Sequence, residues 1–283
     1  MNFLVLADPA DDTALKTALL LRQRHGPERV QIRTADELLL AHWEHRVSNA
    51  GVHNVVRFHD GALITNSERT IIFNRLTAFA PPIFAGASAV NREYARTEMY
   101  ALFLSWLESD RHRVVNPPSP TGSVSGVMRP LIWQHLALRS GFRTLGLGAT
   151  TSTRRFPAAA GSLPRPDVSS VADPYQNASM NSFGWYSRPL PDRTISALVI
   201  GDKVLGDVSG ITSSSCVRLT TLARIDLLGI DLAFEAPTHE GPEDPGTFIG
   251  ANPCPVIADP SAIHELVQYL ETLASIDCEA ISI

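Results

Sequence analysis

The chain has 283 residues, of which 44% are hydrophobic and 19% are charged, with a formal net charge of −5 and an isoelectric point near 6.0. This length supports two or three subdomains around a substantial core. The negative net charge argues against nucleic-acid binding. No apolar run approaches the roughly 18 residues that are needed to cross a bilayer. The N-terminus lacks a basic leader, and the three cysteines are too scattered for a disulfide framework or a zinc pair, so we expect a cytoplasmic protein.

The first part of the chain alternates apolar strands with amphipathic helices. The predicted order is strand 2–7, helix 13–24, strand 30–32 and helix 35–45. Asp11 or Asp12 can cap the first helix, and Thr34 can cap the second. This order favours a parallel sheet with covering helices. Since no G-x-G-x-x-G sequence follows the first strand, a dinucleotide-binding fingerprint is not expected.

Two histidines stand three residues apart in the second predicted helix. His42 and His45 have Glu44 between them. A pair of histidines alone rarely forms a metal site. We therefore expect this group to lie on a solvated or interfacial face.

The later elements are predicted from apolar periodicity and turn signals. Strands are expected at 55–59, 63–65 and 70–73, with a hairpin at 195–200 and 203–208. Helices are expected at 91–107, 218–228 and 262–274. The polar run Ser213–Ser215 is predicted to be a plain loop, although its hydroxyls and amides could also line an anion site.

The middle of the chain has little periodicity. Residues 151–194 are rich in Ala, Ser, Pro and Gly, a composition typical of loops or of structure that forms only against a partner. We expect 154–186 to be the least regular stretch of the fold. Arg154 and Arg155 are the cations at its start.

Two predicted strands near the C-terminus carry polar residues that suit a cation. The strands span 230–234 and 247–252 and are joined by a polar loop. Alternation places Asn252 on the side of Gly250 and Phe248. The Asp231 carboxylate and the Asn252 amide could together hold Mg²⁺, which takes a few oxygen ligands and keeps its remaining waters. An ordinary hairpin with polar ends is the alternative.

The same stretch carries a family resemblance. A helix, then Gly-Ile-Asp-Leu at 229–232, a polar loop and Phe-Ile-Gly-Ala-Asn-Pro at 248–253 resemble the C-terminal metal-binding end of ATP-grasp proteins. The resemblance is strongest to the branch with the ribosomal-protein glutamate ligases and the microviridin-type peptide ligases. It implies that Asp231 and Asn252 are the metal ligands. The family's second strand carries a metal-binding Glu where this chain has Gly250, so the resemblance is to a degenerate member.

The resemblance extends to other parts of the chain. Residues 114–118 and the helix from Arg129 resemble the family's strand, N-P-P turn and lysine-led helix, with Arg129 in the place of the lysine. The hairpin after Arg193, with Lys203 on its second strand, also matches. The family resemblance implies nucleotide-binding roles for Arg129, Arg193 and Lys203. The family's phosphate-contacting lysine and glycine-rich loop have no counterpart at 150–190.

The fold class that follows is α/β, with a pre-ATP-grasp-like N-terminal domain and an ATP-grasp-like core whose nucleotide lobe is reduced. The predicted divisions are residues 1–115 for the N-terminal domain, 116–194 for a linker helix and the reduced central lobe, and 195–283 for the C-terminal core. Two functions are compatible with this fold. The first is a degenerate protein that binds a peptide or partner in peptide maturation and needs no cofactor. The alternative is an ATP- and Mg²⁺-dependent carboxylate–amine ligase acting through an acyl phosphate.

Aromatic residues outside the predicted elements point to a partner. Phe183, Trp185 and Tyr186 stand close to Arg188, and aromatics with arginine are enriched at binding hot spots. A second cluster contains Phe73, Phe79 and Phe84. We expect a peptide or protein partner, a modifying enzyme or a second copy of the chain. Both segments folding inward over the core is the alternative.

Overall fold

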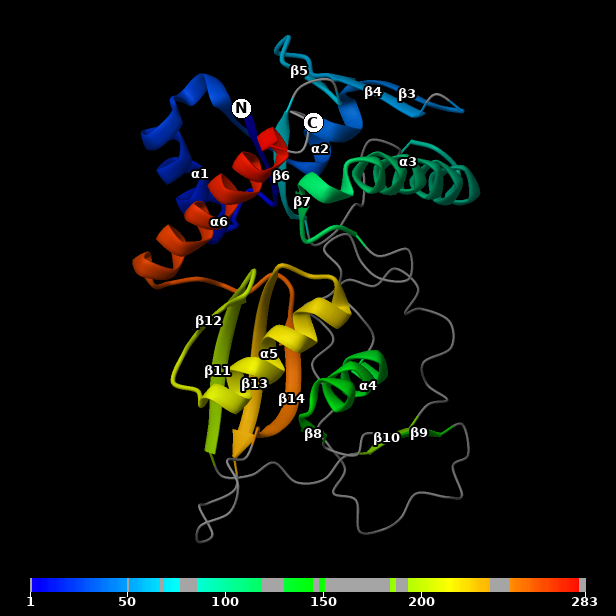
Figure 1. Cartoon of the computed structure of the whole chain (residues 1–283). Helices are drawn as coiled ribbons and strands as arrows, with labels where there is room; N and C mark the ends of the chain where they lie inside the picture. The colour runs from blue at the N-terminus through cyan, green and yellow to red at the C-terminus, as the bar shows by residue number, and fades with distance from the viewer. Residues whose placement is uncertain are drawn as a thin grey trace, which may run out of the picture. The chain divides into compact units, whose positions relative to one another are not determined.

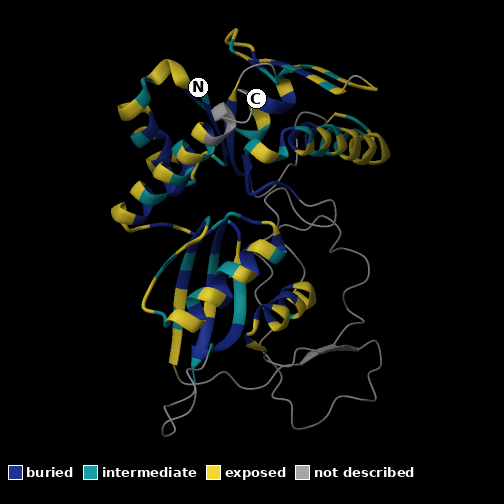
Figure 2. Ribbon diagram, in the orientation of Figure 1, coloured by how far each residue is buried: buried dark blue, intermediate teal, exposed yellow. Residues whose placement is uncertain are grey.

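The computed structural model describes residues 2–49, 51–66, 69–76, 86–118, 130–144, 193–234 and 245–275, together with the backbones of 148–150, 184–186 and 276–279. Two compact units make up the chain. The first combines Met1–Val127 with Val256–Ile283, and the second is Met128–Pro255. The central strands of the main sheet in each unit are largely buried, and the outward faces of the helices are exposed (Figure 2).

The first unit is built on a parallel sheet with the strand order β2-β1-β6-β7. These strands are β1 (Asn2–Ala7), β2 (Val30–Arg33), β6 (Thr70–Arg75) and β7 (Val114–Val115). The central strands β1 and β6 are buried almost throughout. Parallel strands covered on both faces are usually continuous apolar runs, and the run NFLVLA shows this in the sequence.

Helices cover this sheet. They are α1 (Asp12–His25), α2 (Ala35–Leu40), α3 (Ala89–Ser109) and α6 (Pro260–Glu279), with short 3-10 turns at Pro27–Arg29 and Arg111–Arg113. Asp11 caps α1 by accepting a hydrogen bond from the Ala14 amide at 2.9 Å. The last helix, α6, packs against α1 and β6 (Figure 1), so both ends of the chain contribute to this unit. Of the described helices, none is both long and apolar enough to span a membrane.

The predicted helix 35–45 is correct only in its first half. Thr34 and Glu37 form a capping box at its start, but α2 ends at Leu40 and the chain continues as strand β3 (His42–Ser48). Trp43 explains the change, because its indole donates to the Leu38 carbonyl at 2.7 Å and its ring packs edge-on against Trp106. A helix would not direct Trp43 into this contact.

Strand β3 begins a small antiparallel sheet with β4 (Gly51–Arg57) and β5 (Leu63–Thr65). His42 and His45 therefore lie three residues apart in a strand, on opposite faces. The His42 ring packs edge-on against His59, and the His45 ring hydrogen-bonds to Ser105 at 2.8 Å. The expectation that the two histidines share one face of a helix is therefore wrong, and each makes its own contact.

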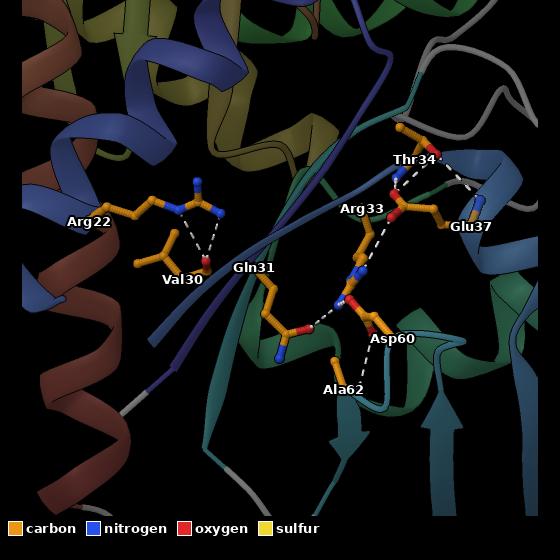
Figure 3. Close-up of polar contacts among 8 residues, drawn as sticks. All are labelled: Arg22, Val30, Gln31, Arg33, Thr34, Glu37, Asp60 and Ala62. Atoms are coloured by element: carbon orange, nitrogen blue, oxygen red, sulfur yellow. Dashed lines mark hydrogen bonds and ion pairs between the residues drawn. The ribbon is translucent and has the colours of Figure 1, made fainter. Parts of the chain in front are cut away.

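A polar cluster connects this small sheet to the parallel one (Figure 3). The Arg33 guanidinium lies 2.8 Å from Asp60 and 3.2 Å from Glu37, and it stacks over the Phe58 ring at 4.1 Å from its centroid. A hydrogen bond from the Ala62 amide, and then the bond from Arg33, lower the pKa of Asp60 below its ordinary value. The cluster thus links β2, α2 and the turn before β5.

The second unit is a five-stranded sheet with helices on one face. Its strand order is β12 (Lys203–Leu205), β11 (Arg193–Ile200), β13 (Leu227–Phe234), β14 (Thr247–Asn252) and β8 (Arg143–Thr144). Only the β14–β8 pair is parallel. Helices α4 (Pro130–Ser140) and α5 (Gly210–Ala223) lie against the sheet (Figure 1). The short strands β9 (Gly148–Thr150) and β10 (Gly184–Tyr186) pair with each other.

The predicted helix 218–228 is wrong in its bounds. Helix α5 begins at Gly210, so Ser213–Ser215 are helical and not a loop, and Leu227 already belongs to β13. Ser209 caps the helix by accepting from the Thr212 amide at 3.2 Å. The helix ends at Arg224, which adopts the left-handed conformation.

Candidate functional site

One face of the second sheet is occupied by its helices. The side chains that pack beneath α4 and α5 include Ala197, Val199, Ile230, Leu232 and Phe248. Because successive side chains of a strand point to opposite faces, Ser196 and Asp231 lie on the other face. That face carries the predicted metal ligands and is the candidate functional site.

The strand register brings the predicted ligands together on this face. Asp231 of β13 lies directly opposite Gly250 of β14, and Gly229 lies opposite Asn252. Side chains two residues apart on a strand share a face. Asp231, Gly250 and Asn252 therefore share one face of the sheet.

A β-bulge corrects one part of the prediction. The register shifts after the pair of Asp231 and Gly250, and the next pair is Leu232 with Phe248. Ile249 is thus the extra residue. The prediction that Phe248 shares the side of Asn252 is wrong, because Phe248 is fully buried on the helix-covered face.

Both predicted ligands already accept hydrogen bonds. Ser196 on the neighbouring strand donates its hydroxyl to Asp231 Oδ1 at 2.6 Å. The Asn252 side-chain oxygen accepts from the Cys254 amide at 2.9 Å. Sequence reasoning did not single out Ser196, because only the pairing of β11 with β13 places it beside Asp231.

Gly250 leaves a space where a second ligand would stand. A Cβ added at Gly250 would meet nothing within 4 Å, and its backbone conformation does not require glycine. Directly opposite positions have Cβ atoms about 4.5–5.5 Å apart, so a carboxylate here would lie next to Asp231. Among the residues that the structure describes, the donor set on this face is one carboxylate and one amide, which is incomplete for a Mg²⁺ site. Among the residues described, no three or more His, Cys, Asp or Glu side chains gather as a metal site.

The predicted nucleotide contacts lie at opposite ends of the sheet. Lys203 pairs with Ile200, which lies on the same face as Ser196. Ile200 and Ser196 are four residues apart, so at 3.3 Å per residue Lys203 lies about 13 Å from Ser196 along the strand. Arg193, by its place in the alternation, belongs to the helix-covered face, and it makes an exposed ion pair with Asp207 at 3.8 Å. The structure therefore does not gather these two cations around Asp231, and their nucleotide-binding roles stay predictions.

Other predicted site residues fall outside the described part of the chain. These are Arg129, Phe183, Arg188, Phe79, Phe84, Arg154 and Arg155. Trp185 and Tyr186 lie in β10, opposite Ala149 and Gly148, where the backbone alone is described. Phe73 is buried in β6 with 1% of its surface exposed, so its assignment to an exposed aromatic surface is wrong.

Comparison with known proteins identifies the fold. No protein-family model matches the sequence, and no curated protein matches it. Solved structures do match over nearly the whole length. The ATP-grasp ligase PsnB, complexed with a phosphomimetic variant of its minimal precursor, Mg and ADP, has a TM-score of 0.68 at 15% identity, covering 96% of this chain and 98% of PsnB.

Two further structures give the same result. The macrocyclase MdnC from Microcystis aeruginosa MRC, bound with the precursor peptide MdnA, has a TM-score of 0.64 at 9% identity, covering 98% of this chain and 99% of MdnC. A RiPP-associated ATP-grasp ligase from Chryseobacterium gregarium, in complex with ADP and a leader and core peptide, has a TM-score of 0.62 at 11% identity, covering 99% and 97%. This chain therefore has the α/β fold of ATP-grasp ligases, which confirms the predicted fold class.

Proposed function

We propose that this chain is an ATP-grasp-fold protein that binds a peptide or protein partner in peptide maturation and no longer catalyses ligation. The observation that carries this proposal is Gly250 opposite Asp231. It leaves a single carboxylate on the face where the resemblance implies a metal site.

The ligase reaction explains why this loss matters. Forming an acyl phosphate from ATP is mostly a matter of positioning the phosphates and neutralising their charge. Mg²⁺ supplies part of that neutralisation and is held by carboxylate oxygens. Asp231 alone contributes one negative charge, and that carboxylate already accepts a bond from Ser196. A weak Mg²⁺ site and weak nucleotide binding follow from this arrangement.

A nucleotide titration tests the loss of the metal site. Wild-type protein is expected to show no rise in melting temperature with millimolar MgATP, whereas a ligand at a hundredfold excess over its Kd would stabilise the fold by about 2.7 kcal/mol. Gly250→Glu adds the missing carboxylate into open space and is expected to increase Mg²⁺-dependent stabilisation. Gly250→Gln, which adds the same volume without charge, is the matched control.

The alternative function, an active ligase, is favoured by one observation: Asp231 and Asn252 are still held on one face. The two functions separate in the same titration. If MgATP stabilises the wild type and Asp231→Asn abolishes that effect while the fold is retained, the proposal of a lost activity is contradicted.

The peptide partner is proposed by analogy with the similar structures. PsnB, MdnC and the Chryseobacterium ligase were each solved with a precursor, leader or core peptide. In this chain we assign the contact to Phe183, Trp185, Tyr186 and Arg188, residue types enriched at hot spots. Size-exclusion chromatography with light scattering, on the chain alone and with the products of neighbouring genes, tests it. A monomer that binds neither a precursor peptide nor a modifying enzyme would contradict the assignment.

A further inference from the structure

A second site lies on the helix side of the second sheet. A pocket of about 390 Å³ opens between the end of α4, at Gly141, and the start of α5, at Gly210. Ser215 and Arg218 also line it, and none of the described residues that line it is acidic. Since α4 and α5 cover the face opposite to Asp231, this pocket is separate from the candidate metal site.

Two donors converge in the pocket without a partner. A Cβ placed at Gly141 would lie 3.4 Å from the Ser215 hydroxyl and 3.9 Å from Arg218 Nη1, so both groups reach the same point. Within the described chain, neither side chain makes a hydrogen bond or ion pair. Gly141 has a φ of +100°, and its missing side chain keeps that point free.

The Ser215 hydroxyl is the unusual member of the pair. Ser215 is a buried residue, with 5% of its surface exposed, and its hydroxyl lies beside the open point at Gly141. Helical serines and threonines often donate to the carbonyl four residues earlier, as Ser214 does to Gly210 at 2.9 Å. Ser215 does not make this bond, so its donor remains available to a group in the pocket.

We propose that this pocket binds one carboxylate of a peptide. The site offers a single guanidinium, which suits a monoanion better than the dianionic phosphate. The planar fork of Arg218 matches the two oxygens of a carboxylate, and the Ser215 hydroxyl completes the recognition. The first turn of α5 adds a partial positive charge. The inference does not depend on the proposed function, because it uses neither Asp231 nor a nucleotide.

A titration followed by NMR tests the proposal on the full chain at constant ionic strength. The probes are acetyl-glutamate amide for a side-chain carboxylate, acetyl-alanine for a terminal carboxylate, acetyl-glutamine amide as the neutral control and inorganic phosphate. Saturable shifts of the Gly141 and Gly210 amide signals are expected with at least one carboxylate probe and not with acetyl-glutamine amide. The carboxylate probe that binds more tightly shows whether the pocket recognises a side-chain carboxylate or a terminal carboxylate of the peptide.

Variants of the pocket residues distinguish binding in the pocket from general attraction to surface charge. Arg218→Gln and Ser215→Ala are each expected to raise the Kd of the carboxylate probe about tenfold, the effect of losing one hydrogen bond to a charged group. Arg139→Gln removes an exposed arginine of the same unit that does not line the pocket, and should leave Kd unchanged. Tighter binding of phosphate than of either carboxylate, non-saturable shifts, or equal binding by Arg218→Gln would each overturn the proposal.

Discussion

Arg33 at the end of β2 is an almost fully buried cation held by groups from α2 and from the turn between β4 and β5. Its guanidinium contacts Glu37 and Asp60 (Figure 3), and it stacks on Phe58. Because a buried cation is stable only when paired, Asp60 stabilises the fold in its ionised form. The hydrogen bonds from Ala62 and Arg33 lower the pKa of Asp60 below 3.8, its ordinary value.

The sign of the pH dependence follows from that shift. A carboxylate with a lowered folded-state pKa contributes stability that is complete above its unfolded pKa and is lost as the pH falls through the folded value. We expect wild type to be more stable than Asp60→Asn at neutral pH, with the difference shrinking below about pH 4. Unfolding in denaturant at several pH values measures this. In Arg33→Gln the pKa of Asp60 should rise toward its ordinary value, because the hydrogen bond from Ala62 remains while the bond from Arg33 is lost.

The candidate site shows how far individual residues of the sequence predict the arrangement of a site. Asp231 and Asn252 are predicted to hold one cation together from their residue types and the family resemblance, and the strand register places both on one face. The bulge at Ile249 was not predictable, since strict alternation assigns Phe248 to the wrong face. An extra residue in one strand is fixed by pairing with its neighbour and not by the local sequence.

Helix α5 shows how a polar run can be helical. Ser209 accepts from the Thr212 amide and satisfies one of the donors left free at a helix start. We expect Ser209→Ala to lower the free energy of unfolding by about 1 kcal/mol. Ser214→Ala, an exposed helix-interior change, should be neutral or slightly stabilising because alanine has the higher helix propensity. Chemical denaturation of both variants measures the difference. An equal loss in the two would contradict the capping role.

The elements that were mispredicted share a physical cause. Helix 35–45 was extended too far because the apolar period continues past Leu40, while the Trp43 contact with Trp106 selects a strand. Helix 218–228 was placed too late because Ser213–Ser215 have the composition of a loop, yet α5 buries Ser215 and Cys216 against the core. In both cases tertiary contacts outweigh a weak local preference.

At the scale of the whole molecule, the two compact units differ in how the chain builds them. The second unit is one continuous segment, while the first is completed by the last part of the sequence. Glu271 of α6 contacts both Arg24 and His25 at 2.8 Å, and the Ile257 amide donates to Thr13 at 2.9 Å. The apolar periodicity of 262–274 predicted this helix but could not predict that it packs against α1 and β6. The three predicted divisions at 1–115, 116–194 and 195–283 stay a prediction.

The return of α6 leads to a prediction about the stability of each unit. Ending the chain after Pro255 removes α6 and with it three side chains that are fully buried in the first unit, namely Leu266, Val267 and Leu270. Each leucine lost from a core costs about 2–5 kcal/mol, which approaches the total stability of a domain. The truncated chain is therefore expected to lose the protection of β1 and β6 in hydrogen exchange, because the first unit loses the helix that packs on α1 and β6 and part of its core. Strands β11 and β13 belong to the other unit and should remain protected.

A chain ending after Glu279, which keeps all of α6, is the matched control and should exchange like the wild type. Unchanged protection of β1 and β6 after the longer truncation would show that the first unit is stable without α6.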